Sequence, residues 1–287
     1  MNAGAGAAQD MRFREAAAAI DAGDADALSR ILAAHPVLAS ERLEAPGSWL
    51  RAQVGAALEG YFHRPCLLWF VAGNPVRHER LPDNIAQMAA LLARATRRAG
   101  DGGWQHRLDY ALGLTVTGRV ARESGVQIGL IDALVDAGAR PGDGVGALGA
   151  ANLEAAARLL ERGGTLTLAG ALCLDRATEA AALAHHATYA DRQIALVAAA
   201  VNGNARALAA LVATGVDIDA YSLVIHPHAT ALHQAVAAGS LEATEVLAEA
   251  GARLDIRDKI YRGTPLDWAE HLGHDAIAAY LRRKARS

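Results

Sequence analysis

The chain has 287 residues, of which 52 % are hydrophobic, 21 % charged and 5 % aromatic, and its formal net charge is −3. This balance excludes a strongly basic nucleic-acid-binding protein and gives no electrostatic reason to expect a membrane surface. Abundant alanine favours helices, because it loses the least side-chain entropy in them. Cys66 and Cys173 lie too far apart for a zinc motif. We expect two buried thiols, no cofactor and a reducing cytoplasm.

The first segment in chain order, residues 1–10, is rich in alanine and glycine. We predict that it forms a flexible tail. The apolar run that follows is too short for a secretory signal, and no run approaches the roughly 18 apolar residues of a membrane span. The chain contains only two lysines, Lys259 and Lys284, against many arginines. That bias is typical of a GC-rich genome and predicts a bacterial source.

Residues 11–191 show amphipathic segments that are separated by turn signals. Apolar spacings of three and four residues predict divergent helix pairs, and one pair stacked on the next would cover faces that a single pair leaves open. Two insertions, residues 41–64 and 74–84, interrupt this pattern. Insertions in stacked repeats fall on loops, which often lie on the binding face.

Residues 192–285 contain three similar segments. They read Ile-Ala-Leu-Val-Ala-Ala-Ala at 194–200, Ala-Thr-Ala-Leu-His-Gln-Ala at 229–235 and Gly-Thr-Pro-Leu-Asp-Trp-Ala at 263–269. Thr264 is suited to cap a helix, with Pro265 at its first position. Gly273 then permits a tight turn, and residues 277–281 continue as a second amphipathic helix. Each segment therefore predicts a helix–turn–helix unit.

These segments resemble ankyrin repeats, whose pattern of about 33 residues opens its first helix with T-P-L-H-x-A. The matching positions are Thr230, Leu232, His233 and Ala235 in one segment and Thr264, Pro265, Leu266 and Ala269 in the next. The resemblance implies an all-α, ankyrin-like solenoid of about eight stacked helix pairs, continuous from residue 11. It implies short hairpin fingers, the loops that lead into first helices, mainly in the C-terminal half. It also implies a structural role for His233, between repeats.

The same resemblance implies a non-catalytic scaffold that binds a protein partner through its fingers and concave face. We expect the partner-binding residues to lie in the fingers and insertions. The first predicted patch comprises Tyr221, His226, His228, Asp258, Tyr261 and Arg262, and the second comprises Tyr61, His63 and Arg64. We predict no catalytic residues, no resident metal, no nucleic-acid partner and a monomeric chain.

Two alternatives remain open at this stage. His226 and His228 form a His-x-His pair, which would place two possible zinc ligands on one face of a strand. The N-terminal insertions could instead cover a small-molecule pocket lined by Trp69 and Tyr61. The first alternative predicts a metal-dependent site in the histidine-rich fingers, and the second predicts a ligand sensor.

Overall fold

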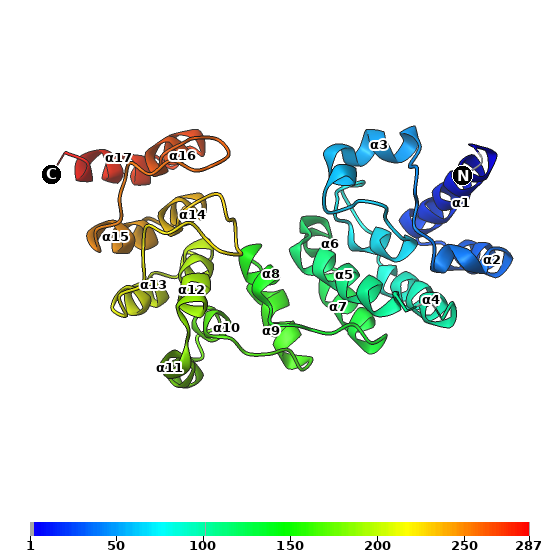
Figure 1. Cartoon of the computed structure of the whole chain (residues 1–287), viewed down its shortest axis with the longest axis horizontal. Coiled ribbons are helices and arrows are strands. Elements are labelled where there is room, and N and C mark those ends of the chain that lie inside the picture. The colour runs from blue at the N-terminus through cyan, green and yellow to red at the C-terminus, as the bar shows by residue number, and fades with distance from the viewer. Residues whose placement is uncertain (1–2, 101, 287) are drawn as a thin grey trace. The chain divides into compact units, whose positions relative to one another are not determined.

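The structure, a computed structural model, describes residues 3–100 and 102–286. It consists of helices joined by turns and loops (Figure 1). In the described part of the chain the only β-type pairing is an isolated antiparallel bridge between Tyr221 and Thr230. The predicted all-α class is therefore confirmed, whereas the fingers are loops rather than extended hairpins. None of the described helices combines the length and the apolar character that a membrane span requires.

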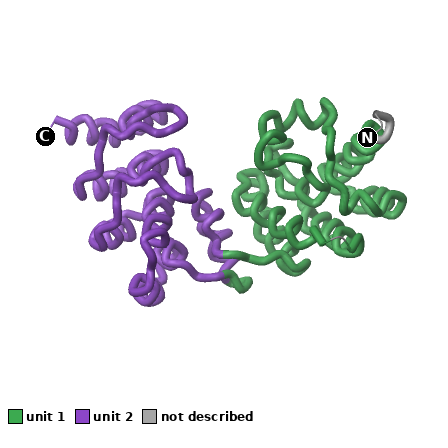
Figure 2. Tube along the Cα trace, in the orientation of Figure 1, with its two compact units in different colours: residues 1–142, 161–164 green, residues 143–160, 165–287 purple. Residues whose placement is uncertain are grey.

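The chain divides into two compact units (Figure 2). Unit 1 comprises residues 1–142 and 161–164, and unit 2 comprises residues 143–160 and 165–287. The change in repeat character that the sequence suggests at residue 192 does not coincide with this division. The helices between residues 143 and 191 belong with the C-terminal repeats instead. A single continuous solenoid stays a prediction.

Unit 1 combines α-helices with three 3₁₀ helices among its described residues. They are α1 (Ala3–Ala22), α2 (Ala25–Ala34), η1 (Pro36–Ala39), α3 (Ser48–Val54), η2 (Gly55–Glu59), η3 (Leu67–Ala72), α4 (Ile85–Arg98), α5 (Trp104–Thr117), α6 (Arg119–Glu123) and α7 (Gln127–Asp136). Helix α1 begins at Ala3, so the predicted flexible tail is wrong for residues 3–10; residues 1 and 2 lie outside the described residues. Alanine favours the helical backbone there.

The core of unit 1 is built from large side chains. Phe13, Phe62, Trp69 and Phe70 are all at most 3 % exposed. The rings of Phe62 and Phe70 lie 5.4 Å apart, and the guanidinium of Arg77 lies 4.7 Å from the centre of the Phe70 ring. These contacts join α1, η3 and the segments around residues 62 and 77 into one core.

The first predicted insertion, residues 41–64, is not a simple loop. It contains α3 and η2, and it places Leu43, Leu50 and Phe62 in the core. The second, residues 74–84, contains no helix. Its Arg77 forms a bidentate ion pair with Asp21 of α1, at 2.7 and 2.6 Å. Both insertions are thus tied to the repeats that they interrupt.

Unit 2 consists of successive helices joined by turns and finger loops. They are α8 (Val145–Gly149), α9 (Leu153–Glu161), α10 (Leu168–Cys173), α11 (Ala177–His186), α12 (Tyr189–Val201), α13 (Ala205–Val212), α14 (Ala231–Ala237), α15 (Leu241–Glu249), α16 (Pro265–His271) and α17 (Asp275–Lys284). First helices pack in a row from α10 through α12 and α14 to α16, and second helices pack from α13 through α15 to α17.

The helix starts of unit 2 follow from their caps. Thr188, Thr230 and Thr264 each form a capping box with the residue three positions later. In α16, for example, the Asp267 amide donates to Thr264 Oγ1 while the Thr264 amide donates to Asp267 Oδ2, so two otherwise unpaired donors are satisfied. Because Thr188 caps α12, this helix begins at Tyr189, a few residues before the predicted repeat start. Counted over both units, the described helices form about eight pairs, as predicted.

Candidate functional site

Two finger loops of unit 2, residues 213–230 and 251–264, lie side by side and are hydrogen-bonded to each other. The Lys259 amide donates to the His228 carbonyl at 2.8 Å, and the Tyr221 hydroxyl donates to the Arg257 carbonyl at 2.7 Å. The Lys259 ammonium lies 4.1 Å from the centre of the Tyr221 ring. These contacts hold the two fingers as one surface.

The first finger is also anchored on α8. Ile225 is 5 % exposed and packs against Gly149, where an added Cβ would lie 3.1 Å from its side chain. His226 Nε2 is 2.8 Å from the Gly149 carbonyl oxygen, which accepts a hydrogen bond when this nitrogen carries the proton. His226 has a positive φ of 48°, so the finger turns sharply at its anchor. Position 149 therefore needs the close approach that glycine allows.

The second finger is organised by one buried carboxylate. Asp258 is 0 % exposed, and its Oδ1 accepts from the amides of Ile260 and Tyr261 at 2.8 and 2.6 Å. Its Oδ2 accepts from the Gly263 amide at 2.8 Å and from the Trp268 indole at 3.0 Å. The carboxylate thus holds the loop around itself and ties it to α16.

Asp258 is not available to a partner, which corrects its prediction as a surface residue. Burial by itself raises the pKa of a carboxyl, but the hydrogen bonds from Tyr261, Trp268, Gly263 and Ile260 outweigh burial here and lower the pKa of Asp258 to about 2. The carboxylate is therefore ionised at neutral pH, and both of its oxygen atoms accept hydrogen bonds from the loop amides and from the Trp268 indole. This structural role of Asp258 could not be predicted from the sequence, because acidic residues in turns are usually exposed to solvent.

A cluster of aromatic side chains packs beneath the tips of both fingers, around Trp268 of α16. The ring centre of Trp268 lies 5.1 Å from that of His233, 6.0 Å from that of His228 and 6.5 Å from that of Tyr261. Burial lowers the pKa of both histidines, although Asp258 acts in the opposite direction. The buried His233 places Nε2 3.1 Å from the Gly263 carbonyl of the next repeat. It has the structural role that the resemblance implied.

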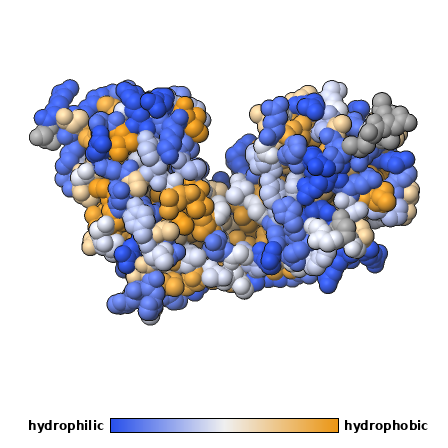
Figure 3. All heavy atoms as spheres, in the orientation of Figure 1, coloured by the Kyte–Doolittle hydropathy of each residue, from blue (hydrophilic) through white to orange (hydrophobic). Residues whose placement is uncertain are grey.

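The finger tips expose large apolar side chains. The exposed fractions are 55 % for Leu223, 58 % for Val224, 61 % for Ile260 and 75 % for Tyr261. We call these four residues the finger-tip patch. Figure 3 shows hydrophobic residues gathered on the visible face of unit 2. Sequence reasoning found only Tyr261. Adjacent apolar residues inside a loop, without helical spacing, were the signal that could have revealed Leu223 and Val224.

The other predicted residues of the first patch lie around these tips. Arg262 is exposed, with a positive φ of 60°, and its carbonyl accepts from the Arg257 guanidinium at 2.6 Å. Tyr221 and His228 are half-buried between the fingers, and His226 is exposed at the α8 anchor. The structure therefore brings all six residues onto the two fingers, with Asp258 inside them.

The second predicted patch lies in unit 1. Tyr61 is 49 % exposed, and its hydroxyl donates to Asn74 Oδ1 at 3.0 Å; burial and the nearby Tyr110 raise its pKa. His63 is exposed, with Nδ1 3.1 Å from the Leu58 carbonyl oxygen. Arg64 is exposed and forms an ion pair with Glu44, whose hydrogen bond raises the pKa of the guanidinium. Tyr61, His63 and Arg64 are therefore neighbours in the chain, and each forms a hydrogen bond or ion pair with another residue of unit 1.

A cavity of about 670 Å³ lies next to Tyr61, between Asn74 and the α5 residues His106, Tyr110 and Thr117. Trp69 does not line it, contrary to the prediction, because this side chain is 3 % exposed and lies beneath Tyr110, with ring centres 4.3 Å apart. The cavity is broad and open to solvent rather than enclosed.

The metal alternative finds little support in the fingers. The rings of His226 and His228 lie 6.1 Å apart and nearly perpendicular, and His226 Nε2 is engaged with Gly149. Over residues 3–100 and 102–286, no three His, Cys, Asp or Glu side chains gather in an arrangement that could hold a metal ion. The thiols of Cys66 and Cys173 are buried, and burial raises their pKa to about 11 and about 12, respectively.

The sequence matches the family model described as ankyrin repeats (3 copies), over residues 126–258 and 196–286. The two matches together span residues 126–286, more than half of the chain. The chain belongs to the ankyrin repeat family. Ankyrin repeats generally mediate protein–protein interactions, and the structure of unit 2 shows the stacked helix pairs and finger loops of such repeats.

Curated relatives match only a short stretch. Cyclin-dependent kinase inhibitor 2A is 50 % identical over 54 residues in its human form, and 46 % identical over 55 residues in that of Monodelphis domestica. Human cyclin-dependent kinase 4 inhibitor B is 49 % identical over 51 residues. The stretches cover 18–19 % of this chain and 34, 32 and 36 % of those three proteins. The chain thus spans about a third of the length of the curated relatives it matches.

Among solved structures, the human ASB11 ankyrin repeat domain is similar, with 17 % sequence identity. The superposition covers 71 % of this chain and 98 % of that chain, with a TM-score of 0.37.

Proposed function

We propose that this protein is a non-catalytic scaffold that binds a protein partner through the two fingers of unit 2. The observation that carries the proposal is the finger-tip patch, which keeps four large apolar side chains at least half exposed on loops that are held in place. Contiguous exposed apolar side chains on an otherwise polar surface mark interaction sites. Tyr261 is of the type that contributes most at interfaces, because its large ring has few rotatable bonds.

Preorganisation supports this proposal. Asp258, the Tyr221–Arg257 bond and the α8 anchor fix the backbone of both fingers before a partner arrives. Because the finger loops are already ordered, little conformational entropy is lost on binding, and a small apolar contact area is enough for measurable binding affinity. The exposed Arg262 and the Lys259 ammonium add positive charge beside the patch. We therefore expect the partner to present apolar side chains bordered by acceptors or acidic groups.

The relatives are consistent with a protein partner, since their names describe inhibitors of cyclin-dependent kinases. Because the shared stretch is short, we propose a protein partner without assigning it to a class of protein. On compositional grounds, the proposal also includes a bacterial, cytoplasmic protein that binds neither nucleic acid nor membrane. We also propose that the chain is monomeric. His63 and Arg64 beside Tyr61 remain proposed as a second contact region.

The test is affinity purification from the native host with the full chain, followed by titration of the recovered protein in purified form. We expect Tyr261→Ala to weaken binding by about tenfold or more, as loss of an interface anchor does, and Val224→Ala to weaken it by a smaller factor. Their melting temperatures should stay unchanged, because both side chains are more than half exposed.

Tyr189→Ala is the matched control. Tyr189 is also 58 % exposed, but it lies at the start of α12 rather than on a finger. If Tyr189→Ala weakened binding as much as Tyr261→Ala, the finger-tip surface would be the wrong one. If no protein bound the wild-type chain above background, the scaffold function itself would be wrong.

A second candidate function is a small-molecule sensor at the Tyr61 cavity, favoured by its mixed aromatic and polar lining. A metabolite that binds only the folded state should raise the melting temperature of the wild-type chain. Gly113→Leu should remove this rise, because Gly113 lines the cavity and has no atom within 4 Å of an added Cβ. Retention of the full shift in that variant would exclude the cavity.

A further inference from the structure

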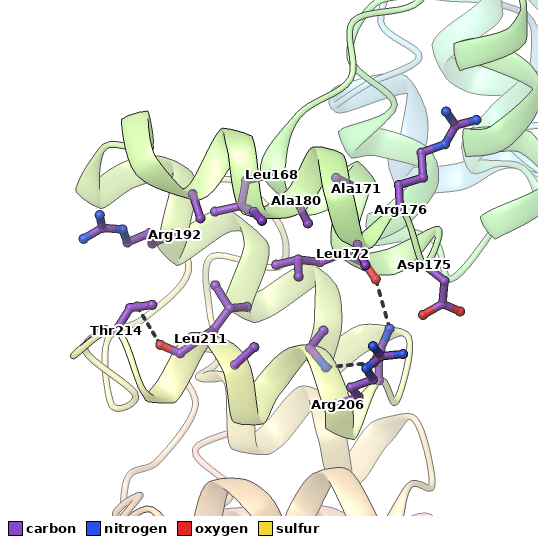
Figure 4. Close-up of a pocket in the computed structure, with 16 residues that line it drawn as sticks. Leu168, Ala171, Leu172, Asp175, Arg176, Ala180, Arg192, Arg206, Leu211 and Thr214 are labelled. Carbon is purple, nitrogen blue, oxygen red and sulfur yellow. Dashed lines mark hydrogen bonds between the residues drawn. The ribbon is translucent and has the colours of Figure 1, made fainter.

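A groove of about 280 Å³ runs between α11 and α13 in unit 2 (Figure 4). Its walls are apolar and small, with Ala180, Ala181 and Ala184 from α11 and Ala207, Ala210 and Leu211 from α13. It extends from the N-terminal ends of both helices, at Arg176 and Arg206, to their C-terminal ends, near Ala184 and Thr214. The two helices are therefore its parallel sides.

The groove interrupts the row of second helices. Helix α13 packs closely against α15, and α15 packs against α17, but α11 packs on its own first helix, α10, rather than on α13. The facing residues of both helices are largely alanine, and they leave apolar surface of α11 and α13 open toward the groove.

An arginine without an ion pair to any described residue stands at each end of this apolar surface. Arg206 is exposed at the N-terminal end, and Arg192 is half-buried at the other end. Neither guanidinium forms an ion pair or hydrogen bond with any residue that the structure describes. Arg176 is partly neutralised by Glu179, at 3.5 Å. The acidic Asp175 lines the groove at the same end as Arg206 (Figure 4), so Arg192 is the arginine with less acidic surroundings in the lining. The N-termini of α11 and α13 add positive potential at the Arg206 end.

The shape favours a helix over a small molecule as the occupant. The groove is open to solvent along its length and smaller than the roughly 300–1,000 Å³ of typical ligand pockets, so a small ligand would stay largely hydrated. A helix needs to insert only one row of side chains. Helix α13 has 8 residues, so at 1.5 Å per residue the groove matches about two turns of such a helix.

We propose that this groove binds an amphipathic α-helix of a partner protein, with its apolar face between α11 and α13 and acidic side chains on Arg192 and Arg206. Apolar residues at i, i+4 and i+7 of the bound helix fill the space that the alanines leave open. Acidic residues at each end of that stripe form charge-assisted hydrogen bonds with the two guanidinium groups. This site is separate from the finger-tip patch and does not depend on it.

The test uses the full chain and two labelled synthetic peptides, with binding followed by fluorescence anisotropy. Both peptides are alanine-based helices with leucine at i, i+4 and i+7; one carries glutamate at both ends of this stripe and the other carries lysine. We expect the glutamate peptide to bind about tenfold more tightly or better, because the arginines favour only one sign of charge. Equal binding of the two peptides would overturn the proposal.

Matched variants locate the binding site. Arg192→Glu with Arg206→Glu should weaken the glutamate peptide by about tenfold or more. Arg94→Glu with Arg98→Glu is the control, because it makes the same charge change in a different groove, between α2 and α4 in unit 1. Equal loss in both double variants would mean that the peptide responds only to net charge.

A variant whose groove is filled by larger side chains tests whether peptide binding can be lost without a loss of stability. Ala181 and Ala210 line the groove and are exposed, so leucine at both positions occupies it without entering the core. We expect Ala181→Leu with Ala210→Leu to abolish peptide binding and to leave the melting temperature unchanged or raised. Peptide binding that survives in this filled variant would overturn the proposal. Tyr261→Ala should bind the peptide like the wild type, which distinguishes this site from the fingers.

Discussion

The two units hold their helices together with different side chains. In unit 1, Phe13, Phe62, Trp69 and Phe70 fill a core of large rings, and Trp69 and Phe70 belong to a 3₁₀ helix. In unit 2, the buried face of α12 is mostly alanine, and α14 buries the small Ala231 and Ala235 beside Leu232 and Val236. Small residues let neighbouring first helices lie close together, whereas large rings separate helices and fit only one arrangement.

This difference has a consequence for stability. A core of large rings loses most when a ring is removed, because the cavity that remains cannot collapse completely. A core of alanines loses most when bulk is added, because there is no space for further methylene groups. We therefore expect unit 1 to be destabilised most by large-to-small substitutions in its core, and unit 2 to be destabilised most by small-to-large substitutions.

The largest expected effect is in unit 1. Phe70→Ala should lower the free energy of unfolding by about 3–5 kcal/mol, since Phe70 is fully enclosed between Phe62, Trp49 and Arg77. Urea denaturation followed by circular dichroism measures the loss, and hydrogen exchange should place it in residues 3–142. The exposed Val76 supplies the control, because Val76→Ala should change stability by only about 0.5 kcal/mol or less. Loss in unit 2 instead would contradict the comparison.

The reverse substitution tests unit 2. Ala235→Leu should lower the free energy of unfolding by about 1–3 kcal/mol, because Ala235 is 0 % exposed in a helix that packs against both α12 and α16. Ala237→Leu, on the exposed face of the same helix, should stay within about 0.5 kcal/mol of the wild type. Equal stability of the two leucine variants, measured by the same urea titration, would mean that the alanine core of unit 2 has spare volume.

The same comparison explains how much of the fold was predictable. In unit 2, Thr230 and Thr264 perform the same capping task at the same place in successive repeats, so the sequence shows a period. In unit 1, each large side chain fits its own surroundings. Phe62 reaches the core from within a segment that reads as an insertion. The pattern therefore predicted helix pairs there, but neither α3 nor the start of α5 at Trp104.

The candidate site was predictable in outline only. The loop positions of Tyr261 and Arg262 follow from the repeat period, so the fingers could be located without the structure. The role of Asp258 could not, because its four hydrogen bonds come from backbone amides and an indole that only the folded loop brings together. Likewise, nothing in the sequence shows that His226 turns away toward Gly149.

Asp258 makes the second finger sensitive to acid. A carboxylate whose pKa falls from 3.8 to about 2 on folding stabilises the native state above the unfolded value, and this contribution disappears as the pH falls through the folded value. At roughly 1.4 kcal/mol per unit, the contribution is about 2 kcal/mol. The stability difference between the wild type and Asp258→Asn should therefore shrink by about 2 kcal/mol between pH 4.5 and pH 2. Because tryptophan fluorescence would also report Trp49, Trp69 and Trp104 of unit 1, urea denaturation followed by circular dichroism at each pH measures this difference.

A stability difference that stays constant over this pH range would mean that the four donors do not hold Asp258 ionised. Asp258 also acts on the neighbouring histidines. Burial lowers the pKa of His233 and the Asp258 charge raises it, so Asp258→Asn should lower this pKa further. The stability linked to His233 is lost as the pH falls below the ordinary histidine range, and more is lost in the variant than in the wild type.

The smallest effect concerns the cap that repeats along unit 2. Thr264→Ala removes the hydroxyl that accepts from the Asp267 amide, so it should lower the free energy of unfolding by about 1 kcal/mol. Thr264→Ser keeps this acceptor and should recover most of the loss. The cap also sets where α16 begins, directly after the second finger, so Thr264→Ala should loosen the amides of Tyr261 and Gly263 in hydrogen exchange. If stability falls while these amides stay protected, Asp258 alone holds the finger, and the regular caps of unit 2 matter for its helices rather than for its binding surface.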